Sequence, residues 1–365
     1  MVDQPLLPDY DGACVANVVP TLLGHGSPGP WIPAAALEAR QVVLLVLDGM
    51  GWEQMQERRS LIPTMGAMAG GPITTVVPST TSTALTSITT GLPPGEHGIV
   101  GYRIAVHGEV LNVLQWSTAA GPAQQSIPPS KLQPVAPFLG ERPPVVTRAE
   151  YRRSGFTGAH LDPARFWGYR TPATMVTEVG RLLRMSEPFV YAYYDGLDKV
   201  AHEYGLDEHY DAELQWIDHT VERLLAVMRP GGVLLLTADH GQVDVGGNVV
   251  PLAADVLSQL SMQSGEGRFR WLHARSGRGR DLYEAAVAHH TGDAWVMTRD
   301  EVVGGGWFGP VVSEAAKSRL GDVALVARRD VAFHDPLDTG PYTLVGRHGS
   351  VTPAEMLVPL LVGGR

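Results

Sequence analysis

The chain has 365 residues, of which 44% are hydrophobic and 18% charged, and its formal net charge is −10. This composition is ordinary for a folded globular protein and excludes a disordered chain. The negative balance argues against partners such as nucleic-acid polymers or membrane surfaces, which require basic faces. An acidic protein can still act on phosphate esters if metal ions supply local positive charge.

Cysteine content and targeting signals indicate the compartment. Cys14 is the single cysteine, so no intramolecular disulfide is possible. Residues 1–20 lack the basic segment and apolar core of a signal peptide. The longest purely apolar run, "VVLLVL", is far too short to cross a bilayer. We therefore expect a cytoplasmic protein, and we expect it to be a monomer.

Three apolar runs of β-type residues each end in acidic or metal-binding residues. They are "QVVLLVLDGMG" (41–51), "PFVYAYYDGLD" (188–198) and "GVLLLTADHG" (232–241). Continuous apolar runs indicate strands buried on both faces, and therefore a parallel sheet with helices on each side. Amphipathic patterns such as "ATMVTEVGRLLRM" and "HYDAELQWIDHTVERLLAVM" predict those helices. The fold class is α/β.

The ends of these strands carry candidate metal ligands. The functional crevice of an open α/β sheet lies outside the carboxyl ends of its strands, so Asp48, Asp198, Asp239 and His240 are expected to converge. On a helix, Asp198 and His202 form an i,i+4 pair on one face, which can hold one divalent cation. The alternative is a solvated acidic turn with a surface histidine.

The stretch "VVPSTTSTALTSITTGLPPGEHGIVG" (76–101) is crowded with hydroxyl groups. Its Ser/Thr cluster predicts the start of a helix that ends at Gly91. A hydroxyl at a helix N-terminus lies where the helix dipole favours negative charge, which suits an alkoxide that attacks phosphorus. The alternative is that these hydroxyls only cap the helix.

The remaining segments indicate the domain organisation. Residues 102–145 are rich in Pro, Gln and Ser and are expected to form loops with short extended pieces. From about residue 262 a further β/α pattern begins, and it separates "TADHG" from the C-terminal "VGRHGSVTPAEMLVPLLVGG" (345–364). We predict a catalytic core over residues 1–261 and 341–365, with an inserted subdomain over 262–340. His348 precedes a capped helix in the last segment.

Five motifs in order resemble those of the alkaline phosphatase superfamily, in its nucleotide pyrophosphatase/phosphodiesterase branch. They are "LDGMG", "PSTTSTALTSITTGLPPGEHGI", "DKVAHEYG", "TADHG" and "RHGSVTPAEMLVPLL". The resemblance extends from about residue 41 to the C-terminus. It implies an alkaline-phosphatase-like core with a largely parallel sheet flanked by helices on both faces, plus a smaller inserted α/β subdomain.

The resemblance also implies roles for individual residues. One metal site corresponds to Asp48, Asp239 and His240, and the other to Asp198, His202 and His348. The nucleophilic threonine corresponds to Thr81, three residues after the motif proline and ten before the "TG" glycine. Asp195 is then expected to organise the strand end, and His97 to fix the loop after the nucleophile helix.

The implied chemistry is hydrolysis through two divalent metal ions and a phospho-threonine intermediate. Six Asp and His ligands without a thiolate suit zinc or manganese. Two such ions and three aspartates leave the site about one unit positive, which attracts a phosphodiester anion. Many relatives carry a substrate-binding asparagine after "HGIV"; here the segment reads "HGIVGYR", so Tyr102, Arg103 or Asn112 is expected to contact the substrate instead.

The substrate class follows from the same resemblance. The motif spacings look like those of actinobacterial enzymes that hydrolyse cyclic di-AMP through pApA to AMP, so a small-molecule nucleotide is expected. The alternatives are a broader nucleotide pyrophosphatase/phosphodiesterase, a phosphonoacetate-type hydrolase and a non-catalytic metal-bound nucleotide sensor. Five aromatic residues could stack on adenine, although core packing is an alternative for most of them. They are Trp116, Tyr151, Phe166, Trp167 and Tyr169.

Overall fold

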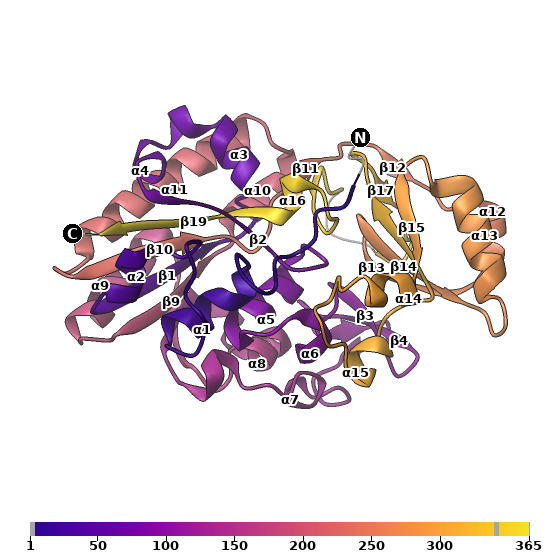
Figure 1. Cartoon of the computed structure of the whole chain (residues 1–365), viewed down its shortest axis with the longest axis horizontal. Coiled ribbons are helices and arrows are strands. Elements are labelled where there is room, and N and C mark those ends of the chain that lie inside the picture. Colours follow the sequence, from indigo (N-terminus) through magenta and orange to yellow (C-terminus); the bar gives the residue numbers. More distant parts are fainter. Residues whose placement is uncertain (1–3, 339–342, 365) are drawn as a thin grey trace.

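A seven-stranded sheet forms the centre of the computed structural model, which describes residues 4–338 and 343–364 (Figure 1). In spatial order its strands are β2 (Ala69–Thr74), β19 (Leu357–Gly364), β10 (Gly232–Thr237), β1 (Gln41–Leu47), β9 (Phe189–Tyr194), β7 (Pro144–Arg148) and β8 (Arg165–Tyr169). Strands β10, β1, β9, β7 and β8 run parallel, and β19 runs antiparallel to both neighbours. The predicted α/β fold with a largely parallel sheet is confirmed.

The three apolar runs form the three adjacent strands β10, β1 and β9. Every residue of β9 and β10 is buried, as expected for strands covered on both faces. In the β1–β9 register Leu47 lies opposite Tyr194, and in the β1–β10 register Val46 lies opposite Thr237. The chain therefore leaves all three strands at the same edge of the sheet, and the residues that follow meet there.

Helices cover both faces of this sheet. The helices of this part of the chain are α1 (Val18–Leu22), α2 (Ala34–Glu38), α3 (Trp52–Glu57), α4 (Pro63–Gly66), α5 (Thr81–Thr90), α6 (Pro94–His97), α8 (Gly155–His160), α9 (Pro172–Arg184), α10 (Gly196–Tyr204), α11 (Glu208–Val227) and α16 (Pro353–Met356). In Figure 1, α10 and α11 lie on one side of the sheet and α1, α5 and α8 on the other. The amphipathic patterns predicted α9 and α11, and Gly91 ends α5 in a left-handed conformation as expected.

The segment 102–145 is more regular than expected. It forms a four-stranded sheet of β3 (Arg103–Val106), β4 (Glu109–Asn112), β5 (Ser117–Thr118) and β6 (Gly121–Pro122), followed by the short helix α7 (Pro129–Leu132). His107 and Gly108 join β3 to β4 with positive φ angles of 52° and 84°. Such two-residue turns match the twist of a hairpin, so a local signal for β3–β4 was present.

A second four-stranded sheet lies beside the one formed by β3 to β6 (Figure 1, right). It comprises β13 (Leu260–Glu266), β14 (Phe269–Ala274), β16 (Val323–Ala327) and β15 (Ala294–Thr298), with α12 (Ala254–Gln259), α13 (Gly279–His290), α14 (Arg299–Gly304) and α15 (Glu314–Lys317). Leu272 and Leu325 pack into a small separate core, whereas Phe269 and Trp271 belong to the main core. Because Phe269 and Trp271 pack in the main core, this sheet is held against the rest of the protein.

The division into a core and an inserted subdomain stays a prediction. The second sheet begins at Leu260, close to the expected start at 262. The other expected boundary, between residues 340 and 341, lies outside the described residues. Two short ladders, β12 (Val249–Val250) with β17 (Ala332–Phe333) and β11 (Val243–Asp244) with β18 (Gly346–Arg347), connect the chain near these limits.

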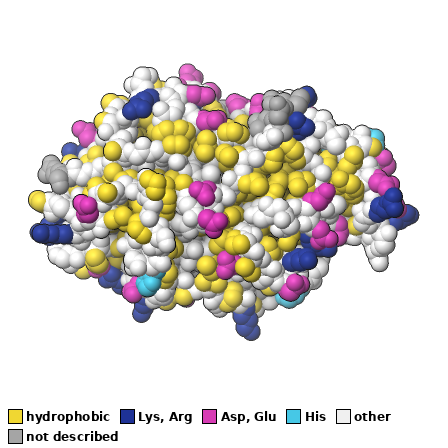
Figure 2. All heavy atoms as spheres, in the orientation of Figure 1, with side chains coloured by type: hydrophobic (Ala, Val, Ile, Leu, Met, Phe, Trp, Pro, Cys, Tyr) yellow, Lys and Arg dark blue, Asp and Glu magenta, His cyan; other side chains and the backbone are white. Residues whose placement is uncertain are grey.

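The surface and the helix lengths complete the description. On the face shown in Figure 2, acidic and basic side chains of the described residues are dispersed among apolar and neutral ones. Among the helices of the described residues, none combines the length and the apolar character needed to span a bilayer.

Candidate active site

Asp48, Asp239 and His240 meet at the carboxyl ends of β1 and β10. Nε2 of His240 lies 3.4 Å from Asp48 Oδ1 and 3.5 Å from Asp239 Oδ2. One ligand atom from each of the three residues lies within 4.8 Å of the others, and all three residues are buried. The two strand ends therefore deliver two carboxylates and one imidazole to a single point, as expected from the sequence.

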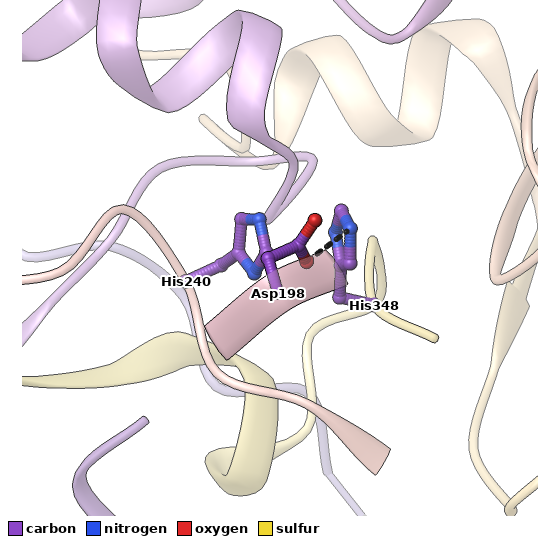
Figure 3. Close-up of side chains that lie close together, drawn as sticks. All are labelled: Asp198, His240 and His348. Carbon is purple, nitrogen blue, oxygen red and sulfur yellow. Dashed lines mark ion pairs between the residues drawn. The ribbon is translucent and has the colours of Figure 1, made fainter. Parts of the chain in front are cut away.

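A second group adjoins the first and contains Asp198, His240 and His348 (Figure 3). Asp198 Oδ1 lies 3.6 Å from His348 Nε2, and the rings of His240 and His348 stack with centroids 3.6 Å apart. His202, one turn further along α10, places Nε2 3.3 Å from the other oxygen of Asp198. His202 thus faces Asp198 but lies outside both three-residue groups, and His240 contributes to both.

In each of the three imidazoles, Nδ1 faces a backbone carbonyl oxygen. Nδ1 of His202 lies 2.8 Å from the Gly346 carbonyl oxygen, and Nδ1 of His348 lies 2.9 Å from the Ser79 carbonyl oxygen. Nδ1 of His240 lies 3.0 Å from the carbonyl oxygen of the next residue. A carbonyl only accepts, so each Nδ1 carries the proton and each Nε2 lone pair is directed at the carboxylates.

The buried carboxylates and imidazoles of these groups are suited to hold a cation. Asp48 Oδ1 and Asp239 Oδ2 have no hydrogen-bond partner among the described residues. Burial raises the pKa of Asp48, and the neighbouring carboxylates Asp239 and Asp198 raise it further. Burial also lowers the pKa of His348, which keeps its ring neutral. Unpaired carboxylate oxygens beside neutral imidazoles form a donor set that suits divalent metal ions.

Thr81 is the first residue of α5, and its side chain reaches the first group. Thr81 Oγ1 lies 3.1 Å from His240 Nε2. The neighbouring hydroxyl of Ser82 donates to the Gly101 carbonyl oxygen at 2.9 Å and therefore serves the loop after the helix. The free N–H groups and dipole of the helix N-terminus favour negative charge at the Thr81 position.

Several hydrogen-bond donors that the sequence analysis did not single out hold the carboxylates in place. The Tyr193 hydroxyl donates to Asp48 Oδ2, and Gln242 Nε2 donates to Asp198 Oδ1 at 2.6 Å. The Gly49 N–H donates to Asp239 Oδ1 at 3.1 Å. Gly49 has φ of +74°, and a Cβ there would lie 2.8 Å from Gln242 Nε2. The position of Gln242 directly after "TADHG" was the one local signal for these contacts.

A cavity of about 170 Å³ opens beside Thr81 and Asp48. Its walls include Leu85, Tyr151 and Phe156. His160, which the sequence analysis assigned to no site, lines the cavity and stacks on Phe156 with ring centroids 3.9 Å apart. Burial lowers the pKa of His160 to about 4, so the ring is neutral near pH 7. The mixture of aromatic, aliphatic and polar walls is typical of pockets for small organic ligands.

The five aromatic residues that could stack on adenine or pack in the core are dispersed. Tyr151 lines this cavity, whereas Trp116 is fully buried and donates from its indole N–H to the Ile127 carbonyl oxygen at 2.7 Å. Tyr169 is also buried, and its hydroxyl donates to the Tyr193 carbonyl oxygen at 3.1 Å. The guanidinium of Arg181 lies over the Trp167 ring, and that of Arg152 over the Phe166 ring.

Three predicted substrate contacts have other partners in the structure. Arg103 pairs with Asp335 at 2.6 Å, and Asn112 Nδ2 donates to the Tyr102 hydroxyl at 2.7 Å. None of Tyr102, Arg103 and Asn112 is among the described residues that line the cavity beside Thr81. Their role in substrate binding stays a prediction.

Asp195 was predicted to organise the end of its strand and His97 to fix the loop after α5, and both make hydrogen bonds at these places. Asp195 accepts hydrogen bonds from Arg148 and Tyr151 at the end of β9. His97 Nδ1 accepts from the Ile99 N–H at 3.1 Å, and its Nε2 lies 2.8 Å from Ser87 Oγ on α5. His97 thus connects α5 to the loop that follows it.

The family of type I phosphodiesterases and nucleotide pyrophosphatases has a sequence model that matches residues 42–182 and 170–351. The chain therefore belongs to this family, within the alkaline phosphatase superfamily. It is a hydrolase that acts on phosphoric diester bonds. Enzymes of this family use divalent metal ions, in agreement with the two groups of ligand atoms. No curated protein matches the chain in sequence.

Solved structures share the fold. Murine ectonucleotide pyrophosphatase/phosphodiesterase 5 superposes with a TM-score of 0.66 at 17% identity, over 89% of this chain and 88% of that chain. An inactive variant of the murine protein, solved in complex with AMP, gives a TM-score of 0.67 at 16% identity with the same coverage. Phosphonoacetate hydrolase from Sinorhizobium meliloti 1021 gives 0.65 at 18% identity, over 99% and 94% of the two chains.

Proposed function

We propose that the protein hydrolyses nucleotide phosphodiester bonds with Thr81 as the nucleophile and two divalent metal ions as cofactors. The observation that carries the proposal is the position of Thr81. Its hydroxyl lies at a helix N-terminus and 3.1 Å from the inward-facing lone pair of His240. The Thr81 hydroxyl and the predicted metal ligands therefore point toward the same place, where a phosphate group can lie.

The six predicted ligands divide between the two ions. Asp48, Asp239 and His240 would hold one ion, and Asp198, His202 and His348 the other. When bound, such ions neutralise phosphate charge and stabilise attacking and leaving oxygens. Three carboxylates and three imidazoles without a thiolate favour zinc or manganese.

The chain's own residues determine the course of the reaction. Thr81 Oγ1 loses its proton to solvent and forms a bond to phosphorus as the bond to the leaving oxygen breaks, which gives a phospho-threonine, and the leaving oxygen takes up a proton from water. A water molecule then forms a bond to phosphorus as the bond from phosphorus to Thr81 Oγ1 breaks, which restores the Thr81 hydroxyl and releases the phosphorylated product. Each displacement inverts the configuration at phosphorus, so the complete reaction retains it. The helix N-terminus at Thr81 stabilises negative charge in both steps.

We favour cyclic di-AMP as the substrate, with pApA and AMP as products. The motif spacings support this choice, and the cavity beside Thr81 offers the aromatic surfaces of Tyr151 and Phe156 to a nucleobase. A broader nucleotide pyrophosphatase/phosphodiesterase activity is the second candidate, because a structure with the same fold binds AMP. Phosphonoacetate-type hydrolysis has the weaker support of a shared fold alone.

A chromatographic panel tests the function. Purified protein is loaded with zinc or manganese and incubated with cyclic di-AMP, cyclic di-GMP, pApA, ATP and a dinucleotide polyphosphate. We expect chelator-sensitive hydrolysis, fastest for cyclic di-AMP, and a phosphorylated Thr81 in quenched samples by mass spectrometry. Absence of turnover in every metal-loaded reaction would contradict the proposal and favour a nucleotide sensor. Faster turnover of ATP than of cyclic di-AMP would favour the second candidate.

A further inference from the structure

Lys199 lies on the wall of the cavity that Thr81 also lines. It follows Asp198 directly on α10, and its side chain is 51% exposed. Nζ lies 2.6 Å from Asp195 Oδ2 and donates to the Tyr151 hydroxyl at 3.2 Å. An ammonium group has three donors, so these two described partners hold it in place while the third N–H can serve a ligand.

Lys199, Arg148 and Asp195 together carry one net positive charge, and the adjacent carboxylate of Asp198 belongs to the predicted metal ligands. Burial alone would raise the pKa of Asp195, but Lys199 and the other donors around this carboxyl outweigh burial and lower it. The ionised Asp195 also pairs with Arg148, so two cations share one carboxylate and one positive charge remains. Glu150 lies 3.7 Å from both Arg148 and Arg170. Glu150 adds one negative charge and Arg170 one positive charge, so the net charge of the group does not change.

Lys199 lines the same cavity as Thr81 and the predicted metal ligands Asp48 and Asp198. A ligand in this cavity can therefore place one anionic group at Thr81 and a second one at Lys199. The salt bridge to Asp195 restricts the lysine before any ligand binds, which lowers the entropy that binding would otherwise cost. A phosphate oxygen is a suitable acceptor for the remaining N–H.

We infer that Lys199 binds a second phosphate group of the substrate while the first phosphate lies at Thr81. The inference rests on the proposed function and narrows it to substrates with at least two phosphate groups. The second group can be the other diester of a cyclic dinucleotide, the terminal phosphate of a linear dinucleotide or an outer phosphate of a nucleoside triphosphate. Lys199 is thus a specificity-determining residue.

The inference is tested by comparing the kinetics of a substrate with one phosphate group and of substrates with two or more. The quantity measured is kcat/KM for cyclic di-AMP, pApA or ATP, each divided by kcat/KM for bis-p-nitrophenyl phosphate. We expect Lys199→Gln to lower this ratio by about tenfold, the effect of losing one charge-assisted hydrogen bond, mainly through KM. Lys199→Arg should recover most of the ratio. Lys131→Gln, which changes another exposed lysine on α7, should keep it.

Binding gives a readout that does not depend on turnover. In a Thr81→Ala background, calorimetry is expected to show about tenfold weaker binding of cyclic di-AMP when Lys199→Gln is added. The metal content of both proteins, measured by mass spectrometry, should agree, because Lys199 is no ligand. The substrate with the largest change identifies which second phosphate Lys199 contacts.

Two outcomes would overturn the inference. One is an equal loss on bis-p-nitrophenyl phosphate and on every substrate with two phosphates, which would indicate a general disturbance of Asp198. The other is an unchanged ratio for all of those substrates. In both cases the wild-type protein still hydrolyses bis-p-nitrophenyl phosphate, whereas failure of the proposed function itself would remove that activity.

Discussion

Thr81 Oγ1 lies 3.1 Å from Nε2 of His240, although the two residues are 159 positions apart in the chain. Thr81 begins α5 after a loop that follows β2, and His240 follows β10 at the edge of the central sheet. The Nδ1 of His240 is occupied by a backbone carbonyl, so the ring cannot turn away without losing that hydrogen bond. The hydroxyl of Thr81 is therefore positioned against a rigid part of the fold.

Replacement of Thr81 should separate catalysis from metal binding. We expect Thr81→Ala to lower kcat by at least about 10³-fold, because the Thr81 hydroxyl contacts His240 whereas the neighbouring Ser82 hydroxyl donates to the Gly101 carbonyl oxygen. Thr81→Ser should retain part of the activity. Metal content by mass spectrometry should not change in either variant. Ser82→Ala is the matched control, and full activity of Thr81→Ala would exclude Thr81 as the nucleophile.

Two aspartates that follow strands β10 and β9 of the central sheet should differ in their effect on metal binding. Asp239→Asn removes a charge from the first group of ligand atoms and should lower metal stoichiometry and activity together. Asp195→Asn should preserve the stoichiometry, because this carboxylate faces Arg148, Tyr151 and Lys199 instead. Metal analysis after gel filtration measures both. Equal metal loss in the two variants would contradict the division of roles.

Gln242 should support the second metal site through Asp198. Its side-chain N–H donates to Asp198 Oδ1 at 2.6 Å, which orients the carboxylate toward His348. We expect Gln242→Leu to weaken metal affinity by about 10- to 100-fold, the usual cost of losing such a supporting contact. Titration with a competing chelator measures this affinity. The exposed Gln115→Leu is the control, and wild-type affinity in Gln242→Leu would refute the prediction.

Glu266 should make stability depend on pH. Burial raises the pKa of this carboxyl from 4.5 to about 8, and its one described donor is the Tyr102 N–H at 3.0 Å. Between these values the folded state holds a proton that the unfolded state has lost, so the free energy of unfolding falls as pH rises from 4.5 to 8. The contribution is at most about 1.4 kcal/mol per pH unit for one proton.

Glu266→Gln should remove this contribution. Urea denaturation of the metal-loaded protein at several pH values between 5 and 8 measures it. The stability of Glu266→Gln relative to the wild type should increase steadily with pH over that range. The exposed Glu314→Gln should parallel the wild type throughout. A constant difference between Glu266→Gln and the wild type would show that Glu266 does not titrate there.

Much of the architecture could be predicted because its causes are local. Uninterrupted apolar runs produced β1, β9 and β10, since strands buried on both faces need apolar residues at every position. The end of α5 followed from Gly91, whose left-handed backbone a glycine adopts without steric cost. The hairpin β3–β4 was missed, although its two-residue turn was visible in the sequence.

What the sequence by itself determined was the set of chemically capable residues and the order of the strands and helices that carry them. Asp48, Asp239 and His240 were candidates because each follows a predicted strand, and the resemblance to a known family singled out Thr81 among the hydroxyls of its segment. Only the tertiary structure decided which atoms meet. The stacking of His240 on His348, the bond from Gln242 to Asp198 and the place of Lys199 beside Thr81 depend on how distant segments pack. Such packing distances depend on the whole core, and no local pattern encodes them.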